Sequence, residues 1–180
     1  MKLKIARAFL SVVICLWTAS LQAADDLTVC KGTFALCTTA TCTPVPGHEG
    51  TVSCGCDVKT GYSAGHESCQ KAEAVGPGHL MSRYYPVKYR AICSNSRPWA
   101  NCLDKPCTID KNNPSKATCA CSLVQNAGDY VVVTPTYDAS TCTTGIVSSA
   151  TGKNATLMDD FLKTQPELKP FPIKVVNPQK

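Results

Sequence analysis

Short stretches in which apolar and polar residues alternate recur along the chain, and they predict β-strands rather than helices. Two of them, residues 52–58 and 117–123, each carry two cysteines at alternate positions. Residues 129–134 give the clearest strand pattern, because their β-branched and aromatic side chains favour extended backbone. No segment between Cys30 and Cys142 has an apolar stripe of helical period long enough to predict a helix. The pattern therefore predicts a mainly β fold with long loops.

The pattern changes after Cys142, where one short C-terminal helix and an extended tail are expected. Thr156 and Asp159 have the spacing of a capping box, which predicts a helix over about residues 157–163. Prolines then interrupt regular structure at Pro166, Pro170, Pro172 and Pro178. We interpret this tail as a frayed terminus, and a docking strand made by residues 172–176 is the alternative.

Twelve of the thirteen cysteines form two sets of six with nearly the same spacing. The first set is Cys30, Cys37, Cys42, Cys54, Cys56 and Cys69, and the second is Cys93, Cys102, Cys107, Cys119, Cys121 and Cys142. The inner four cysteines of each set read C-x4-C-x11-C-x-C, with no insertion or deletion between the sets. This match predicts a tandem duplication of a six-cysteine repeat.

The N-terminus has the pattern of an export signal, with a basic start followed by an apolar run from Ala8 to Trp17. The run is shorter than the roughly 20 residues that a membrane-spanning helix needs, and cleavage is expected after Ala23. Cys15 would be the lipidated residue of a lipoprotein signal, but Ile14 is bulky where such signals have a small residue. The signal predicts a periplasmic or secreted protein, with no membrane span in the mature chain.

The export signal, the two cysteine sets and the change of pattern after Cys142 divide the chain into five predicted segments. They are a signal peptide at 1–23, cysteine repeat 1 at 24–72, a linker at 73–87, cysteine repeat 2 at 88–150, and a short helix with a Pro-rich tail at 151–180. The linker is expected because glycine and proline punctuate residues 74–86. Each repeat is too small to bury a large core, so it would depend on cross-links for stability.

Export favours disulfides over free thiols, because exported proteins meet an oxidising environment. The alternative is a pair of structural zinc sites, since the same spacing could present four thiolates to a metal ion. On a strand, cysteines two positions apart lie roughly 6.5–7 Å apart between their Cα atoms, at the limit for a bridge. Cys54 is therefore not expected to pair with Cys56, nor Cys119 with Cys121. The remaining connectivity stays open, because six cysteines allow about fifteen pairings.

The charge of the chain and the motifs that it lacks disfavour several classes of function. The whole chain has 18 basic and 13 acidic residues, but the signal contains three of the basic ones and no acidic residue. The near-neutral mature chain therefore lacks the basic footprint of a nucleic-acid binder. The chain has no zinc-protease helix, phosphate loop or redox Cys-x-x-Cys motif. We interpret it as an exported, non-enzymatic binding module with no cofactor, and a small secreted hydrolase is the less favoured alternative.

One segment concentrates residue types that dominate binding hot spots. The candidate contact residues are Arg83, Tyr84, Tyr85, Tyr89, Arg90 and Trp99. Aromatic faces also suit sugar rings, so the partner could be a protein or a polysaccharide. The alternative is that Tyr85 and Tyr89 belong to one face of a strand that leads into the second repeat.

His48 and His66 each occur in a Gly-His-Glu tripeptide, and they would serve a metal-binding protein if their loops converged. Solvated loop histidines are the simpler interpretation, because the second repeat has no equivalent pair. Asn154 begins an Asn-Ala-Thr sequon, which matters only in a eukaryotic source.

Overall fold

The computed structural model describes residues 26–168 and 172–177, so the predicted signal peptide lies outside the described residues. Within them the fold is small, disulfide-rich and mainly β, as predicted. The first sheet has the order β10 (Ile146–Val147), β2 (Thr41–Pro44), β3 (Thr51–Gly65), β8 (Lys116–Val124), β7 (Pro106–Ile109) and β4 (His79–Met81), with β1 (Thr28–Leu36) on β3 and β6 (Trp99–Asn101) on β8. The second sheet has the order β11 (Ala150–Thr151), β9 (Tyr130–Thr134), β5 (Tyr89–Cys93) and β12 (Lys174–Val176).

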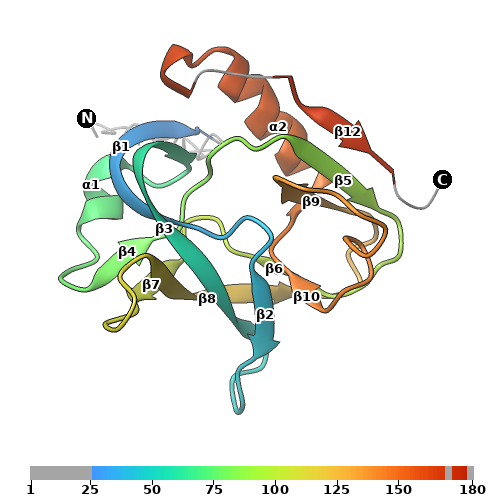
Figure 1. Ribbon diagram of the computed structural model, residues 1–180, viewed down its shortest axis with the longest axis horizontal. Helices are drawn as coiled ribbons and strands as arrows, with labels where there is room; N and C mark the ends of the chain where they lie inside the picture. The colour runs from blue at the N-terminus through green and yellow to red at the C-terminus, as the bar shows by residue number, and fades with distance from the viewer. Residues whose placement is uncertain (1–25, 169–171, 178–180) are drawn as a thin grey trace, which may run out of the picture.

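The antiparallel pair of β3 and β8 forms the centre of the first sheet (Figure 1). Each of these strands also belongs to a hairpin, β3 with β2 and β8 with β7. Cys54 of β3 faces Cys119 of β8, and it also faces Cys42 of β2 across the other edge. The sheet thus brings the cysteines of both sets to one place.

Six disulfides join the twelve predicted cysteines. They are Cys30–Cys69, Cys37–Cys56, Cys42–Cys54, Cys93–Cys142, Cys102–Cys121 and Cys107–Cys119. In each set the first cysteine pairs with the sixth, the second with the fifth and the third with the fourth. The prediction that neither Cys-x-Cys motif closes on itself is confirmed, because alternate residues of a strand reach across to other strands.

Strand register also matches between the two sets. Leu36, just before the second cysteine of its set, faces Asp57, and Asn101 at the same place in the other set faces Ser122. In the first cysteine set this pairing continues along the whole of β1. In the second set the corresponding strand is interrupted at residues 94–98, and the part before the interruption, β5, pairs with β9 in the other sheet. A duplicated unit would produce these matches, and the duplication itself stays a prediction.

Sulfur forms much of the main core. Four bridges pack together there, and the Sγ atoms of Cys37 and Cys119 lie 3.4 Å apart although they belong to different bridges. Small or β-branched side chains such as Ala35, Ala117 and Val52 fill the remaining space, each 0–2% exposed. Disulfides therefore fill and stabilise part of the core, a role that large apolar side chains have in a core of ordinary composition.

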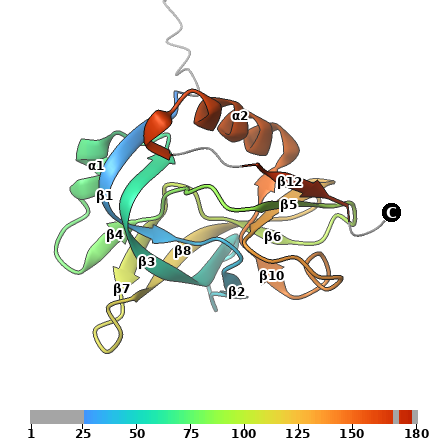
Figure 2. The same ribbon diagram turned by 45° about the horizontal axis from the view of Figure 1, so that its top comes forward.

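Helix α2 (Gly152–Lys163) packs against the upper ends of β1 and β3 through Met158 and Leu162, and it lies across the top of the molecule in Figure 2. It begins five residues earlier than predicted, and the capping box at Thr156 is wrong. The N-cap is Thr151, whose hydroxyl accepts a hydrogen bond from the Asn154 amide 3.2 Å away. Thr151 has extended backbone at the end of β11, which leaves its side chain free to cap the helix.

Two short helices were not predicted from the sequence. Helix α1 (Cys69–Glu73) has Ser68 as its N-cap, and the Ser68 hydroxyl accepts a hydrogen bond from the Lys71 amide. The short helix η1 (Pro166–Leu168) follows α2. Both are about one turn long, which is too short for an apolar period to be recognised in the sequence.

The frayed-terminus prediction for the tail is wrong, and the docking strand is the observed structure. Strand β12 pairs in parallel with β5, with Lys174 opposite Tyr89 and Val176 opposite Ala91. Val176 also packs against the smaller core around Trp99. The prolines that flank this segment do not interrupt it, because none of them lies within β12.

The segment between the cysteine sets takes part in the sheet. Strand β4 pairs with β7, and Leu80 packs into the disulfide core. The next residues continue across the first half, where Tyr84 exchanges backbone hydrogen bonds with Ala64. These contacts place Arg83 inside the molecule, with consequences described below.

Candidate functional site

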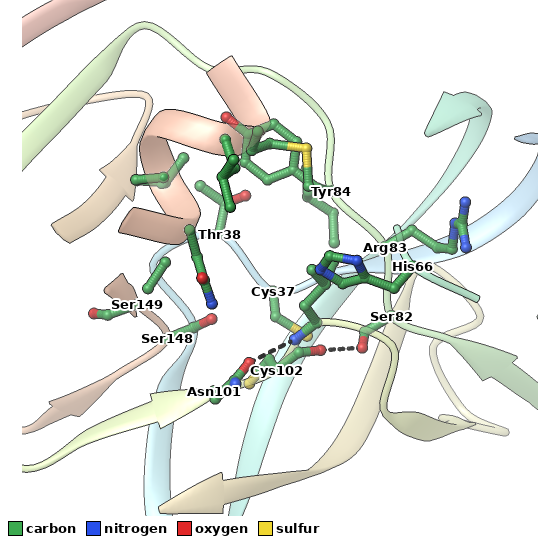
Figure 3. Close-up of a pocket in the computed structure, with 18 of the residues that line it drawn as sticks. Cys37, Thr38, His66, Ser82, Arg83, Tyr84, Asn101, Cys102, Ser148 and Ser149 are labelled. Carbon is green, nitrogen blue, oxygen red and sulfur yellow. Dashed lines mark hydrogen bonds between the residues drawn. The ribbon is translucent and has the colours of Figure 1, made fainter. Parts of the chain in front are cut away.

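A cavity of about 140 Å³ lies between the first turns of α2 and the disulfide core (Figure 3). It is lined by the turn after β1, the segment from Ser82 to Tyr84, the turn after β6, residues 148–150 and α2. These segments are far apart in the sequence, and the two sheets and the helix bring them together. The cavity is the candidate functional site.

The two cysteine sets contribute equivalent residues to this cavity. Leu36, Cys37 and Thr38 surround the second cysteine of the first set, and Asn101, Cys102 and Leu103 surround that of the second. Because the bridges from Cys37 and Cys102 are both part of the core, the cavity floor is held by covalent cross-links.

The wall made by α2 is mainly apolar. Ala155 and Met158 are buried and face the cavity, whereas Leu157 is 40% exposed beside its opening. Leu157 and Met158 can share the cavity wall because neighbouring positions of a helix point only about 100° apart.

Several polar groups also face the cavity. Thr38, Asn101 and Ser148 lie on one side of the hollow and His66 on the other (Figure 3). The Asn101 amide oxygen accepts from the Leu103 amide, 3.3 Å away. Within the described part of the chain, the Thr38 and Ser148 hydroxyls and the Asn101 amide nitrogen make no hydrogen bond with protein. These three groups can therefore bond to a ligand.

Arg83 lies beneath one end of the cavity, with 1% of its side chain exposed. Its guanidinium donates to Asp104 Oδ1 (3.3 Å) and to the carbonyls of Glu67 and Thr28 (both 2.7 Å). Burial lowers the pKa of this guanidinium, while the nearby carboxylates of Asp104 and Glu67 oppose that effect. The pair joins the two halves of the molecule, because Asp104 belongs to the turn after the second cysteine of set two.

Arg90 on β5 also lines the cavity and is 3% exposed. Its Nη2 atom lies 2.6 Å from Asp159 Oδ1 of α2, and Nε lies 3.2 Å from the same oxygen. Nη2 also donates to the hydroxyl of Tyr84, whose ring lies against the guanidinium. Burial raises the pKa of the Tyr84 hydroxyl above its ordinary value, and the Arg90 charge opposes this effect.

The six candidate contact residues do not form one exposed face. Arg83, Arg90 and Trp99 are buried, with Trp99 packed against Tyr130 at 6.3 Å between ring centroids. Of the six, only Tyr85 is an exposed side chain, at 39%. Three of the six, Arg83, Tyr84 and Arg90, line the cavity instead. The lining does not include Tyr85, Tyr89 or Trp99.

The structure does not bring His48 and His66 together. His48 lies in the turn between β2 and β3, and His66 follows the far end of β3 (Figure 1). Since β3 has fifteen residues and a strand advances about 3.3 Å per residue, the two histidines lie at opposite ends of a long strand. The clusters of cysteine sulfurs within 4.8 Å of one another belong to the disulfides, so they are not thiolate ligands.

The cavity includes serines and a histidine, with Asp104 close by, but they do not form a catalytic relay. The Asp104 carboxylate accepts from Arg83 and from the main-chain amide of His66, 2.7 Å away, rather than from its imidazole. A carboxylate that orients a general base would contact the ring nitrogen.

Residues 61–65 have the Gly-x-Ser-x-Gly spacing of a nucleophile elbow, but they lie within strand β3, where Ser63 is 2% exposed and faces Cys30. A nucleophile elbow is a sharp turn between a strand and a helix, so this segment does not have that geometry.

Sequence reasoning missed the cavity, including Thr38, Asn101, Ser148 and Met158. One signal could have found part of it, because Thr38 and Asn101 flank equivalent cysteines of the two sets. Ser148 and Met158 carry no such signal, since only the packing of α2 brings them to the site.

The fold and its six disulfides show that the chain belongs to the class of small, disulfide-rich, mainly β proteins. Comparisons with protein-family models, curated proteins and solved structures find no match. Of the helices in residues 26–168 and 172–177, none has the length and apolar character needed to span a membrane.

Proposed function

We propose that the protein is a non-enzymatic binding module of the periplasm or extracellular space, and that the cavity beneath α2 is its ligand site. Six disulfides are typical of a protein that works in an oxidising environment. The export-signal pattern at residues 1–23 supports the same location. The cavity carries the proposal, because it combines an apolar wall with polar groups that have no partner among the described residues.

Covalent bridges and buried ion pairs hold several walls of the site in place. Two disulfides support its floor, Arg83 pairs with Asp104 beside it, and Arg90 pairs with Asp159 of α2. A site whose walls are ordered before the ligand arrives loses less conformational entropy on binding. This rigidity suits recognition better than it suits a structural spacer, which needs no preformed cavity.

The volume limits what can enter. An apolar protein cavity of about 150 Å³ binds a single benzene ring. The present cavity is of this size, so it would hold one ring or one side chain of a ligand. A protein partner would contribute a single anchoring side chain, and a polysaccharide could place no more than one residue here.

A fragment screen tests the proposal. Small uncharged fragments would be added to ¹⁵N-labelled protein, and binding should shift the amide resonances of Thr38, Ser148 and Met158. Ala155→Leu adds a side chain into the cavity and should abolish these shifts. Thr156→Leu makes the equivalent addition on the exposed side of α2 and should leave them unchanged. If no fragment shifts the cavity resonances of the wild-type protein, the proposed site is wrong.

A further inference from the structure

Resting on the proposed function, we infer that the cavity beneath α2 recognises an uncharged aromatic ring with a hydroxyl group, the chemistry of a phenol. The ring could come from a free phenolic compound or from a tyrosine side chain of a partner. Three features of the site lead to this class: its sulfur atoms, its paired charges and its hydrogen-bonding groups.

Sulfur lines the cavity from two directions. Cys37 and Cys102 contribute to the floor, and the Sγ atoms of Cys37, Cys102 and Cys121 lie within 4.8 Å of one another. Met158 of α2, which is also buried, adds a thioether to the residues that line the cavity. Sulfur atoms make favourable contacts with aromatic rings, particularly at the ring edge. An aliphatic ring of the same size would gain the apolar burial but not these contacts.

The charged groups of the cavity are already paired. The Arg83 guanidinium donates hydrogen bonds to Asp104 and to two carbonyls. The Arg90 guanidinium donates to Asp159, to Tyr84 and to the carbonyls of Val87 and Tyr89. Of the guanidinium nitrogens of Arg83 and Arg90, only Nε of Arg83 has no partner among the described residues, and this atom is buried. An anionic ligand would therefore have to displace a buried carboxylate from one of the arginines, which is costly. The site therefore selects an uncharged ligand.

The hydrogen-bonding groups lie together on one side of the hollow. The Thr38 and Ser148 hydroxyls can each donate and accept, and the Asn101 amide nitrogen can donate. A ligand hydroxyl directed to this side would satisfy them while its ring lies against the sulfur atoms and Met158. A ligand without a polar group would leave these groups unpaired once water is excluded.

Calorimetric titration with matched probes tests the inference. Phenol is expected to bind at least about tenfold more tightly than cyclohexanol, because only phenol can use the sulfur contacts. Benzoate should bind at least about tenfold more weakly than phenol, because its charge could pair with an arginine only by displacing a buried carboxylate. Met158→Leu conserves volume but removes one sulfur, so it should weaken phenol binding by roughly two- to tenfold and leave cyclohexanol unchanged.

The source of the ring is tested with N-acetyl-tyrosinamide beside phenol. Tighter binding of the tyrosine derivative would support a protein partner, and binding of phenol alone would support a small phenolic ligand. Equal binding of phenol and cyclohexanol would overturn the aromatic inference while leaving the proposed binding site intact. If fragments shift the cavity resonances but phenol does not bind, the inference is again wrong. If no fragment and no probe binds, the proposed function also fails.

Discussion

Arg90 on β5 and Asp159 on α2 form a buried ion pair, with 2.6 Å between Nη2 and Oδ1. The two residues are 69 positions apart, and their contact joins the second sheet to the helix that covers the cavity. The pair therefore ties the stability of the fold to the shape of the candidate site.

Replacing Arg90 should destabilise the protein strongly. Arg90→Leu leaves the Asp159 carboxylate without its partner in a site where it is only 20% exposed, and it also removes the donor to Tyr84. We expect the free energy of unfolding to fall by about 3 kcal/mol, measured by urea denaturation. Lys163→Leu, which breaks the exposed pair with Asp160, should have no measurable effect. Equal effects of the two substitutions would show that the Arg90 pair does not hold the helix.

Gly65 is a position where a side chain does not fit. A Cβ atom there would overlap Asp104 Oδ1 and lie 2.8 Å from Nη1 of Arg83. Gly65→Ala should therefore lower the free energy of unfolding by about 1–3 kcal/mol in the same assay. Gly55→Ala on the same strand is the matched control, because it has open space within 4 Å and should raise stability by about 0.5 kcal/mol. A neutral Gly65→Ala would mean that the buried pair can move aside.

The turn between the second and third cysteines has a left-handed residue in both sets, Thr39 at φ 55° and Asp104 at φ 54°. A β-branched residue is unfavourable in this conformation, whereas asparagine tolerates it. Thr39→Asn should raise the free energy of unfolding by about 0.5–1 kcal/mol. Thr41→Asn in the neighbouring strand should instead lower it. Stabilisation by both substitutions would indicate a cause other than backbone conformation.

The disulfides should differ in their contribution to stability according to the loops that they close. Cys93–Cys142 spans 49 residues and Cys42–Cys54 spans 12, although all four cysteines are similarly buried. The chain-entropy model gives about 4 kcal/mol for the long loop and about 3 kcal/mol for the short one. The double Cys→Ala variant of Cys93 and Cys142 should therefore be about 1 kcal/mol less stable than that of Cys42 and Cys54. The opposite order in urea unfolding would show that packing in the sulfur core outweighs loop closure.

Stability should fall at alkaline pH because burial raises the pKa of the Tyr84 hydroxyl in the folded protein. The folded state keeps this proton after the unfolded chain begins to lose it near about pH 10. The stabilisation that the protonated Tyr84 hydroxyl contributes is therefore complete below that pH, and the free energy of unfolding decreases as the pH rises above it. Urea unfolding at about pH 8 and about pH 11 measures the loss.

Tyr84→Phe should reduce this alkaline loss without abolishing it, since burial also raises the pKa of Tyr130. Tyr62→Phe, at a residue that is 36% exposed, should behave as the wild type. An unchanged pH dependence in Tyr84→Phe would contradict the assignment to this hydroxyl.

Local pattern and cysteine spacing were sufficient to predict the fold class. Alternation predicted β3 and β8, and strand geometry excluded bridges within each Cys-x-Cys motif. The helix after Cys142 was also predicted, although its start was misplaced. The capping group is Thr151, and its role depends on the end of β11 rather than on local spacing.

The candidate site was predicted only in part, and the reason is visible in its arginines. Arg83 and Arg90 stand beside tyrosines in the sequence, which is the pattern of an exposed hot spot. Their partners Asp104 and Asp159 lie 21 and 69 positions away, so local sequence could not show that both charges are buried and neutralised. The same holds for β12, whose partner strand β5 is remote in the chain.

The sequence by itself determined the class of this protein, because strand alternation and cysteine spacing are local properties that follow directly from backbone geometry and oxidative pairing. Only the tertiary structure decided which cysteines pair, which arginines are buried and where a cavity lies. These features depend on contacts between segments brought together by the two sheets and α2. Such contacts are selected by packing and charge pairing across the whole molecule, which no local pattern records.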